Sequence, residues 1–195
     1  QARVPRLMLA TWLIELYVAA IQAQEPTSEY YQTLLLEAQE ILERHHDALD
    51  ARTTYALLAR QQCTELWLAY ACILQDTDKL VQHWIDQKQW NQALHTLSAQ
   101  SALDAYYASS IALMQHAPEA TIQCWQKCDQ LDVERLIPAL LQYTPAPNES
   151  DVVLMYLQHV IDVQGSKSPA AHALRLSRLC ERASNQSALL KFVES

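Results

Sequence analysis

Cys124 and Cys128 are the residues whose type and spacing come nearest to a metal site in this 195-residue chain. On a helix they would lie one turn apart on the same face, where a histidine such as His116 could complete a set of two thiolates and an imidazole. A zinc site needs a second ligand pair at a matching spacing. No CxxC pair is formed by the other three cysteines, which are Cys63, Cys72 and Cys180. We therefore interpret the cysteines as small core residues of a protein in a reducing compartment.

The doublet His46–Asp47 offers a second kind of chemistry. In metal-dependent phosphohydrolases of the HD type, which are all-α proteins, a histidine and the aspartate after it supply two metal ligands. That site also needs a histidine earlier in the chain, and none precedes His45. The alternative interpretation, which we favour, is a solvated helix end.

Other motifs of catalysis are missing from the sequence. A single glycine excludes the glycine-rich loops that cradle phosphates, and there is no GxSxG elbow around a nucleophilic serine. Asp76 and Asp78 lack the glycine and the terminal glutamate of a calcium loop. The remaining histidines are scattered singly, at His83, His95, His116, His159 and His172. We predict that the chain is not an enzyme and has no catalytic, cofactor-binding or metal-binding residue.

The scarcity of glycine predicts the fold class. Gly165 is the one glycine of the chain, whereas an average domain of this length has about fourteen. Sheets need tight turns, and tight turns need residues that tolerate positive φ angles. We therefore predict an all-α protein whose helices are joined by short polar or proline-marked breaks.

Local signals predict where these helices begin and end. Pro118 and Pro169 stand where a first helical residue should be, and Pro138 lies inside the pattern of residues 132–143, where we expect a kink or a restart. N-cap residues are predicted at Asp50, Asp76, Ser101, Asn148 and Ser168, with Asp104 completing a capping box after Ser101. Breaks between helices are predicted at Pro26, Pro145 and Pro147. The signals indicate about twelve helices of 10 to 20 residues, with neighbours antiparallel.

Apolar residues at helical spacing predict the buried faces. The predicted stripes are Leu34, Leu35, Ala38, Ile41 and Leu42; Leu80, Val81, Trp84 and Ile85; Trp90, Ala93, Leu94 and Leu97; Val133, Leu136, Ile137, Leu140 and Leu141; and Val152, Val153, Tyr156, Leu157, Val160 and Ile161. The five tryptophans, Trp12, Trp67, Trp84, Trp90 and Trp125, are predicted to fill space between helices.

A weak internal repeat suggests how the helices are arranged. Trp84 and Trp90 are six residues apart, as are Trp125 and Leu131, and the second pair follows the first by 41 residues. A period near forty fits solenoids of paired helices, which bury apolar faces only on their neighbours. We predict a right-handed superhelical α-solenoid of antiparallel helix pairs, a single segment over residues 1–195 excised from a longer chain. Its two ends should expose apolar surface.

Charge and hydropathy limit the partners. The formal net charge of −8 and the pI near 5.3 argue against nucleic-acid binding and against docking on anionic lipid. The longest apolar run, Leu66–Leu74, is nine residues, and a membrane span needs about twenty. Arg3 and Arg6 before the apolar residues 7–14 mimic a signal peptide, but Glu15 interrupts the run and no initiator Met is present. We expect an apolar helix there.

Several stretches are similar to the solenoid of one protein family. They read TWLIELY at 11–17, AYACILQDTDKLVQ at 69–82, QKQWNQAL at 87–94 and LDVERLIPALLQY at 131–143. The second and third follow a pattern of clathrin-heavy-chain-type repeats in general. The first and last resemble one family in particular, that of vacuolar protein sorting-associated protein eighteen, called deep orange in flies and Pep three in yeast. The resemblance covers most of the chain and is best between residues 64 and 162.

The resemblance implies a structural role. Members of that family have an N-terminal β-propeller, a long α-solenoid and a C-terminal zinc-binding RING, and they are core subunits of the HOPS and CORVET tethering complexes. These complexes join endosomes, lysosomes or vacuoles, and autophagosomes before SNARE-driven fusion. The chain would be a middle section of the solenoid, on the cytosolic face of those membranes without insertion into them. Its partners would be other tethering subunits, and its exposed ends could self-associate. RING ligands are absent, so zinc binding and ubiquitin-ligase activity do not transfer.

Two rival functions come from other classes. A helical-repeat adaptor of the tetratricopeptide type would bind a short peptide in a concave groove, but the few basic residues do not cluster as such a groove would favour. The other rival is the His46–Asp47 phosphohydrolase.

Overall fold

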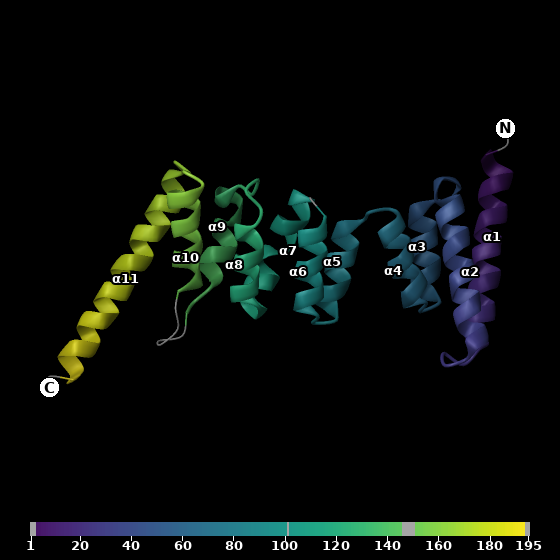
Figure 1. Ribbon diagram of the computed structural model, residues 1–195, viewed down its shortest axis with the longest axis horizontal. Coiled ribbons are helices and arrows are strands. Elements are labelled where there is room, and N and C mark those ends of the chain that lie inside the picture. Colours follow the sequence, from purple (N-terminus) through teal and green to yellow (C-terminus); the bar gives the residue numbers. More distant parts are fainter. Residues whose placement is uncertain (1–2, 101, 146–150, 194–195) are drawn as a thin grey trace. The chain divides into compact units, whose positions relative to one another are not determined.

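The computed structural model describes residues 3–100, 102–145 and 151–193, and every regular element within them is helical (Figure 1). The all-α prediction is therefore confirmed. Contacts divide the chain into two compact units, Gln1–Leu80 and Val81–Ser195, which we call unit 1 and unit 2. The predictions of a single segment over residues 1–195 and of a right-handed superhelix stay predictions.

Unit 1 is a stack in which α1 and α2 each pack on the helix two places further along the chain. It contains α1 (Arg3–Gln22), α2 (Glu29–His45), the short 3-10 helix η1 (His46–Ala48), α3 (Ala51–Arg60), α4 (Thr64–Ile73) and the start of α5 (Thr77–Asp86). Helix α1 contacts α2 and α3, while α4 contacts α2 and α3 (Figure 1). Contacts with second-next neighbours are what build a solenoid rather than a closed bundle.

The core of unit 1 follows the predicted periodicity. In α2 the stripe Leu34, Leu35, Ala38 and Leu42 is buried. These residues join a cluster whose largest fully buried members are Ile14, Leu42, Leu58, Leu66 and Tyr70. Tyr55 of α3 adds an aromatic contact at the edge of this cluster, with its ring centroid 5.1 Å from that of Tyr70.

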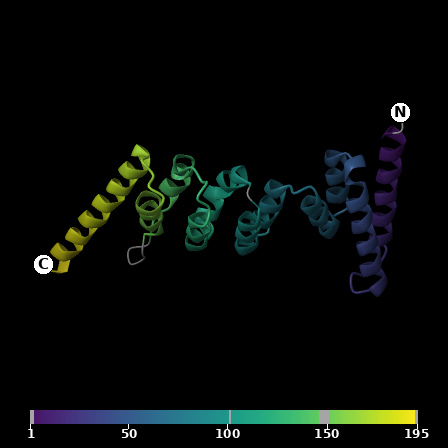
Figure 2. The ribbon, with the colours of Figure 1, turned by 45° about the horizontal axis from the view of Figure 1, so that its top comes forward.

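Unit 2 repeats the same arrangement with more helices. It contains the rest of α5, then α6 (Trp90–Ala99), α7 (Leu103–His116), α8 (Pro118–Gln126), α9 (Val133–Gln142), α10 (Val152–Gln158), the π-helical turn η2 (His159–Val163) and α11 (Pro169–Val193). Helix α8 packs between α6 and α10, and α9 packs between α7 and α11 (Figures 1 and 2). The even-numbered and odd-numbered helices thus form two layers, with the core between them.

Trp125 of α8 lies at the centre of the unit 2 core. Its side chain is fully buried, and the ring of Tyr156 from α10 meets it at 5.5 Å between centroids and 63° between planes. Offset or edge-on aromatic pairs of this kind add to the free energy of burial. The other large fully buried side chains of unit 2 are Leu97, Leu113, Met114, Leu136 and Leu140.

Most of the predicted helix signals are confirmed. The Asp50 carboxylate accepts the Thr53 amide at 2.8 Å, and the Asp76 carboxylate and the Ser168 hydroxyl cap α5 and α11 in the same way. Pro118 and Pro169 are the first residues of α8 and α11. The predicted caps Ser101 and Asn148, and the break at Pro147, lie outside the described residues. Helix α10 is capped by Asp151, whose carboxylate accepts the amides of Val153 and Leu154.

The true spacing of the helices differs from the predicted repeat. Five consecutive helices, α3 to α7, begin at Ala51, Thr64, Thr77, Trp90 and Leu103, which are 13 residues apart. The 41-residue offset from Trp84 to Trp125 runs from α5 to α8, three helices later, so it does not mark a helix pair. The prediction missed the shorter period because helix lengths, rather than recurring residue types, define it.

The regular spacing comes from three helix ends of the same geometry. Gln62, Gln75 and Lys88 follow α3, α4 and α5 with φ angles of 53°, 54° and 57°. After each, the next amide bonds a carbonyl five residues back, at 3.1, 2.9 and 2.8 Å, as in a Schellman motif. Glycine usually occupies this left-handed position, but here it does so only after η2, at Gly165 with φ of 69°. The chain therefore reverses direction without glycine at three helix ends.

Glycine at one of these positions should stabilise the protein. We expect Lys88→Gly to raise the free energy of unfolding by about 0.5–1 kcal/mol, because a side chain at positive φ is strained whereas glycine is not. Urea denaturation followed by circular dichroism measures the change. The matched control is Gln87→Gly, one residue earlier and not at positive φ, which should not stabilise the protein because glycine relieves no strain there. Equal effects at the two positions would show that the left-handed conformation carries no strain.

Two details of the predicted faces are wrong. Leu141 is 59% exposed, although it belongs to the predicted stripe of α9. Trp12 is 57% exposed and fills no space between described helices of unit 1, whereas Trp67, Trp84 and Trp90 are half-buried. The helix of residues 133–142 also runs through Pro138 without restarting. Arg178 of α11 supports its end, donating to the carbonyls of Leu140 at 3.0 Å and Tyr143 at 2.5 Å.

Candidate functional site

The His46–Asp47 doublet lies at the exposed end of α2. His46 Nδ1 is 2.7 Å from the Glu43 carbonyl, and its Nε2 is 3.2 Å from the carboxylate of Asp47, whose side chain is almost completely exposed. No further ligand-type side chain joins the pair, since the described residues contain no group of three His, Cys, Asp or Glu side chains placed to hold a metal ion. The geometry is that of the solvated helix end which the sequence offered as the alternative.

Like the His46–Asp47 doublet, the cysteines are not joined by further ligand-type side chains within the described residues. The interpretation of the cysteines as core residues is correct only for Cys63 and Cys124, which are buried, and burial raises the pKa of both thiols. It is wrong for Cys72 and Cys180, which are exposed. The Cys124 thiol lies 3.8 Å from the Leu94 carbonyl and 4.0 Å from the Tyr106 hydroxyl. The ring of His116, the third ligand of the predicted alternative, stacks on Trp90 at 4.4 Å. Neutral thiols held among core atoms pack as small apolar groups and are poor nucleophiles.

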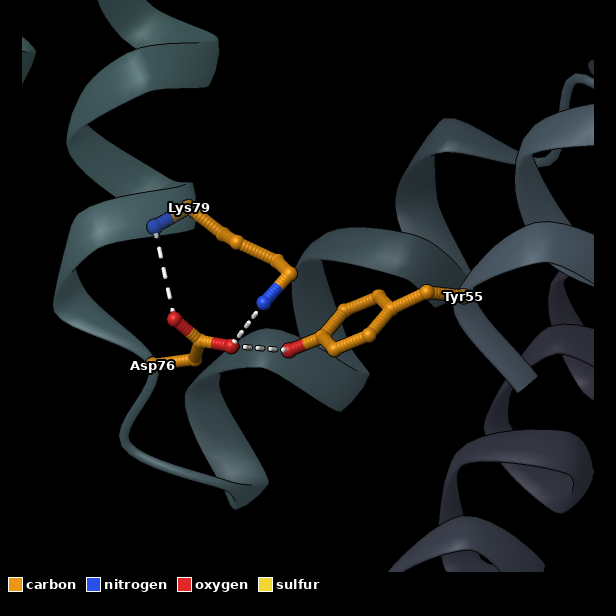
Figure 3. Close-up of polar contacts among 3 residues, drawn as sticks. All are labelled: Tyr55, Asp76 and Lys79. Atoms are coloured by element: carbon orange, nitrogen blue, oxygen red, sulfur yellow. Dashed lines mark hydrogen bonds and ion pairs between the residues drawn. The ribbon is translucent and has the colours of Figure 1, made fainter. Parts of the chain in front are cut away.

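The Asp76 carboxylate accepts hydrogen bonds from a backbone amide, an ammonium and a hydroxyl, all of which are structural (Figure 3). It accepts the Lys79 amide at 3.4 Å as the cap of α5, the Lys79 ammonium at 2.5 Å and the Tyr55 hydroxyl at 3.2 Å. The Lys79 ammonium also lies over the Tyr55 ring, 4.6 Å from its centroid. Burial, and then the Asp76 carboxylate, raise the pKa of the Tyr55 hydroxyl far above its usual value. The cluster fastens the start of α5 to α3 and resembles no calcium loop.

Further polar contacts between helices escaped the sequence analysis. The hydroxyls of Tyr17 and Tyr31 donate to Glu37 and Glu65 at 3.0 and 3.1 Å, joining α1 to α2 and α2 to α4. In unit 2 the Arg135 guanidinium lies 3.7 Å from the Tyr107 ring centroid. No local signal in the sequence could have found these pairs, because the partners are 20 to 34 residues apart.

Several hollows lie on the surface of the described structure. One of about 520 Å³ lies on unit 1 between α1 and the end of α3. On unit 2, one of about 380 Å³ includes Cys124, Cys128 and Lys127, and one of about 210 Å³ is lined by Ile122, Val152 and Met155 together with polar residues. The first two have the size of small ligand pockets, but no catalytic set of side chains converges on any of them.

Exposed apolar side chains concentrate on the first helix of unit 1. Helix α1 exposes Met8, Leu9, Trp12, Leu13 and Leu16, and α11 exposes Leu176 and Leu179. Apolar surface was predicted at both ends of the stack, and both helices carry it. Exposed patches of this kind mark contacts with other helices or proteins more often than chemistry. Within the described residues, no helix combines the length and apolar character that a membrane span requires.

The model of the second half of the VPS18 α-solenoid domain matches residues 78–195. The chain belongs to the VPS18 family. The match begins close to the boundary between unit 1 and unit 2, and it identifies the two-layered stack of unit 2 as an α-solenoid. The predicted family resemblance and solenoid fold are thereby confirmed.

Similarity to curated VPS18 relatives extends beyond the matched half. The vacuolar membrane protein pep3 of Schizosaccharomyces pombe is 26% identical over 206 residues, covering 98% of this chain and 23% of the relative. The VPS18 homologue of Danio rerio is 29% identical over 181 residues, covering 87% and 18%. Vacuolar sorting protein 18 of Arabidopsis thaliana is 27% identical over 199 residues, covering 96% and 20%. The chain thus spans about a fifth of the length of these relatives, and both of its units align with them.

Proposed function

We propose that the chain is a scaffold segment of a core subunit of the HOPS and CORVET tethering complexes, with no catalysis of its own. The observation that carries this proposal is membership of the VPS18 family, whose solenoid model matches 78–195. Its partners would be other tethering subunits rather than nucleic acid. It would act at the cytosolic face of late endosomes, lysosomes or vacuoles, supporting tethering and fusion there and at autophagosomes.

The way the helices pack suits such a role. Helices α6 to α9 of unit 2 each contact the helix two places further along the chain, so every added helix lengthens the stack and adds outer surface. A tethering subunit needs both length and surface, because it must hold several partners and two membranes in place. The polar groups that could have done chemistry are instead used to cap helices and to join them, as Asp76 and Arg178 show.

Production of the 195-residue chain in excess should interfere with vacuolar sorting in cells that also make their own VPS18 relative. If the segment binds tethering subunits, it competes with the endogenous protein for them by mass action. We expect a vacuolar or lysosomal hydrolase to accumulate as its unprocessed precursor when the chain is produced in several-fold excess. Pulse-chase labelling of the hydrolase measures the delay.

The control is a core variant with the same surface residues. Trp125→Ala, produced at the same level, should delay sorting less because unit 2 is less folded. Normal processing in the presence of excess folded parent chain would contradict the proposed partner-binding scaffold.

A further inference from the structure

A groove runs along α6 and α8 on the surface of unit 2. It has a volume of about 180 Å³, and its two walls are rows of residues with the same helical spacing, which are Asn91, Leu94, His95 and Ser98 at α6 and Ala120, Gln123, Cys124 and Lys127 at α8. Leu94 and Cys124 form the floor, because both are buried and the Cys124 thiol lies 3.8 Å from the Leu94 carbonyl. Helix α5 precedes the groove and α9 to α11 follow it, so it lies within the stack rather than at either end.

The rims of the groove carry polar side chains that the fold does not use. Within the described residues, the exposed amides of Asn91 and Gln123 and the imidazole of His95 form no hydrogen bond. The exposed Lys127 ammonium forms no ion pair there. Elsewhere in unit 2, polar side chains such as Arg178 join helices. An amide side chain both donates and accepts hydrogen bonds, so Asn91 and Gln123 match the N–H and C=O groups of an extended peptide backbone.

At one end the groove opens into the larger hollow of about 380 Å³. Ser98, Cys124 and Lys127 line both of them. The groove is about 10 Å long, since each wall spans roughly seven residue steps of a helix, and an extended peptide covers that length with about three residues. Leu103 and Tyr106 contribute apolar atoms to the wall of the hollow. The hollow therefore suits an apolar side chain at the end of the bound segment.

The charges around the groove select the kind of segment that fits it. Lys127 is the one formally charged side chain among the residues that line the groove. Negative charges flank it, at Asp129 in the larger hollow and at Glu119 in the neighbouring hollow between α8 and α10. A single acidic side chain beside Lys127 therefore complements the groove, whereas a run of acidic side chains would meet the flanking carboxylates.

We propose that the groove between α6 and α8 binds an extended segment of a partner protein through one acidic side chain beside Lys127 and one apolar side chain, two residues away, in the hollow lined by Leu103 and Tyr106. Side chains two residues apart in an extended strand point to the same face, so both can turn toward unit 2. The amides of Asn91 and Gln123 form hydrogen bonds with the backbone of the segment. This binding does not require that the chain serve in a tethering complex.

The peptide TTLTETLTT, capped by acetyl and amide groups, tests the binding. Threonine favours extended structure, and a leucine stands two residues from the glutamate on either side, whichever way the peptide runs. We expect the amide NMR signals of α6 and α8 to shift saturably when the 195-residue chain is titrated, with a dissociation constant on the order of 0.1–1 mM. Replacing the glutamate by lysine, or both leucines by threonine, should weaken binding at least about 10-fold.

Two outcomes of this titration would overturn the proposal. One is the absence of saturable shifts up to about 10 mM peptide. The other is equal affinity for N-acetylglutamate amide, because the groove would then hold only a small carboxylate rather than a peptide segment.

A reversed charge tests the contact with Lys127. Lys127→Glu should weaken binding of TTLTETLTT at least about 10-fold and should strengthen binding of the lysine peptide TTLTKTLTT by a similar factor. Lys167→Glu makes the same change at a lysine between η2 and α11, and it should leave both affinities unchanged. Circular dichroism should report the same helix content for both variants, since both lysines are exposed. Equal weakening by the two variants would overturn the assignment of the acidic contact to Lys127.

Two neighbouring amides of α6 test the backbone contacts. Asn91→Ala removes an amide that lines the groove, and it should weaken binding of TTLTETLTT about 3- to 10-fold. Gln92→Ala makes the same kind of change at the next residue, which is exposed but does not line the groove, and it should leave the affinity unchanged. Equal affinities of the two variants for the peptide would overturn the placement of the segment in this groove.

Discussion

Trp125→Ala lowers the free energy of unfolding of unit 2 by about 3–5 kcal/mol, the largest loss that we expect from a single substitution. Trp125 is fully buried between α6 and α10, and its removal leaves a cavity where its ring met Tyr156. Urea denaturation followed by far-ultraviolet circular dichroism measures the loss, because this signal does not depend on tryptophan emission. If the two units unfold in separate transitions, the change belongs to that of Val81–Ser195.

The matched variant for this position is Trp125→Phe. It keeps an aromatic ring against Tyr156 and removes an indole N–H that is buried without a hydrogen-bond partner among the described protein atoms. We expect it to cost less than half as much as Trp125→Ala, because a smaller cavity forms and no satisfied polar group is lost. Equal thermal and urea stability of the parent and Trp125→Ala would contradict the burial of this side chain.

Leu140→Ala lowers the free energy of unfolding by about 2–5 kcal/mol, whereas Leu141→Ala changes it by less than about 0.5 kcal/mol. The two leucines are neighbours in α9, but Leu140 is fully buried and Leu141 is exposed. Both substitutions remove the same atoms from the same helix, so the change in helix propensity is the same for both. The same urea titration measures the pair. A loss at Leu141 that matched the loss at Leu140 would show that α9 is rotated from the orientation described here.

The contrast between these leucines shows where sequence periodicity stops being informative. Val133, Leu136, Leu140 and Leu141 all fit a helical stripe, and the pattern alone gives no reason to leave one out. Helix α9 packs on α7 and on α11, and those contacts bury only part of the apolar arc. Which part is buried depends on the positions of neighbouring helices, which local spacing does not determine.

Helix boundaries were easier to predict than helix packing. An aspartate or serine before an apolar stripe is a local signal, and Asp50, Asp76 and Ser168 cap helices as that signal indicates. The 13-residue spacing of α3 to α7 was missed because it is a property of lengths and of left-handed residues such as Gln75. Glutamine at positive φ is rare, so no composition rule could have indicated those three turns.

For the candidate site residues, too, the local sequence predicted some features, whereas others depend on contacts between residues far apart in the chain. The sequence indicated that His46–Asp47 and the cysteine pair lack further ligands, and the structure places His46 and Asp47 at an exposed helix end and buries Cys124. It also indicated that the ends of the solenoid expose apolar surface, and α1 carries such surface, but it did not indicate which side of residues 7–21 would be exposed. A two-sided apolar pattern does not indicate which side is buried, and the structure shows that Ala10, Ile14 and Val18 are.

Affinity capture from cytosol with the folded 195-residue chain as bait, read by mass spectrometry, tests the scaffold most directly. The account predicts recovery of other tethering-complex subunits above an immobilised Trp125→Ala control. A well-folded bait that recovers none of them would contradict a partner-binding role for these helices and would leave the segment as a spacer.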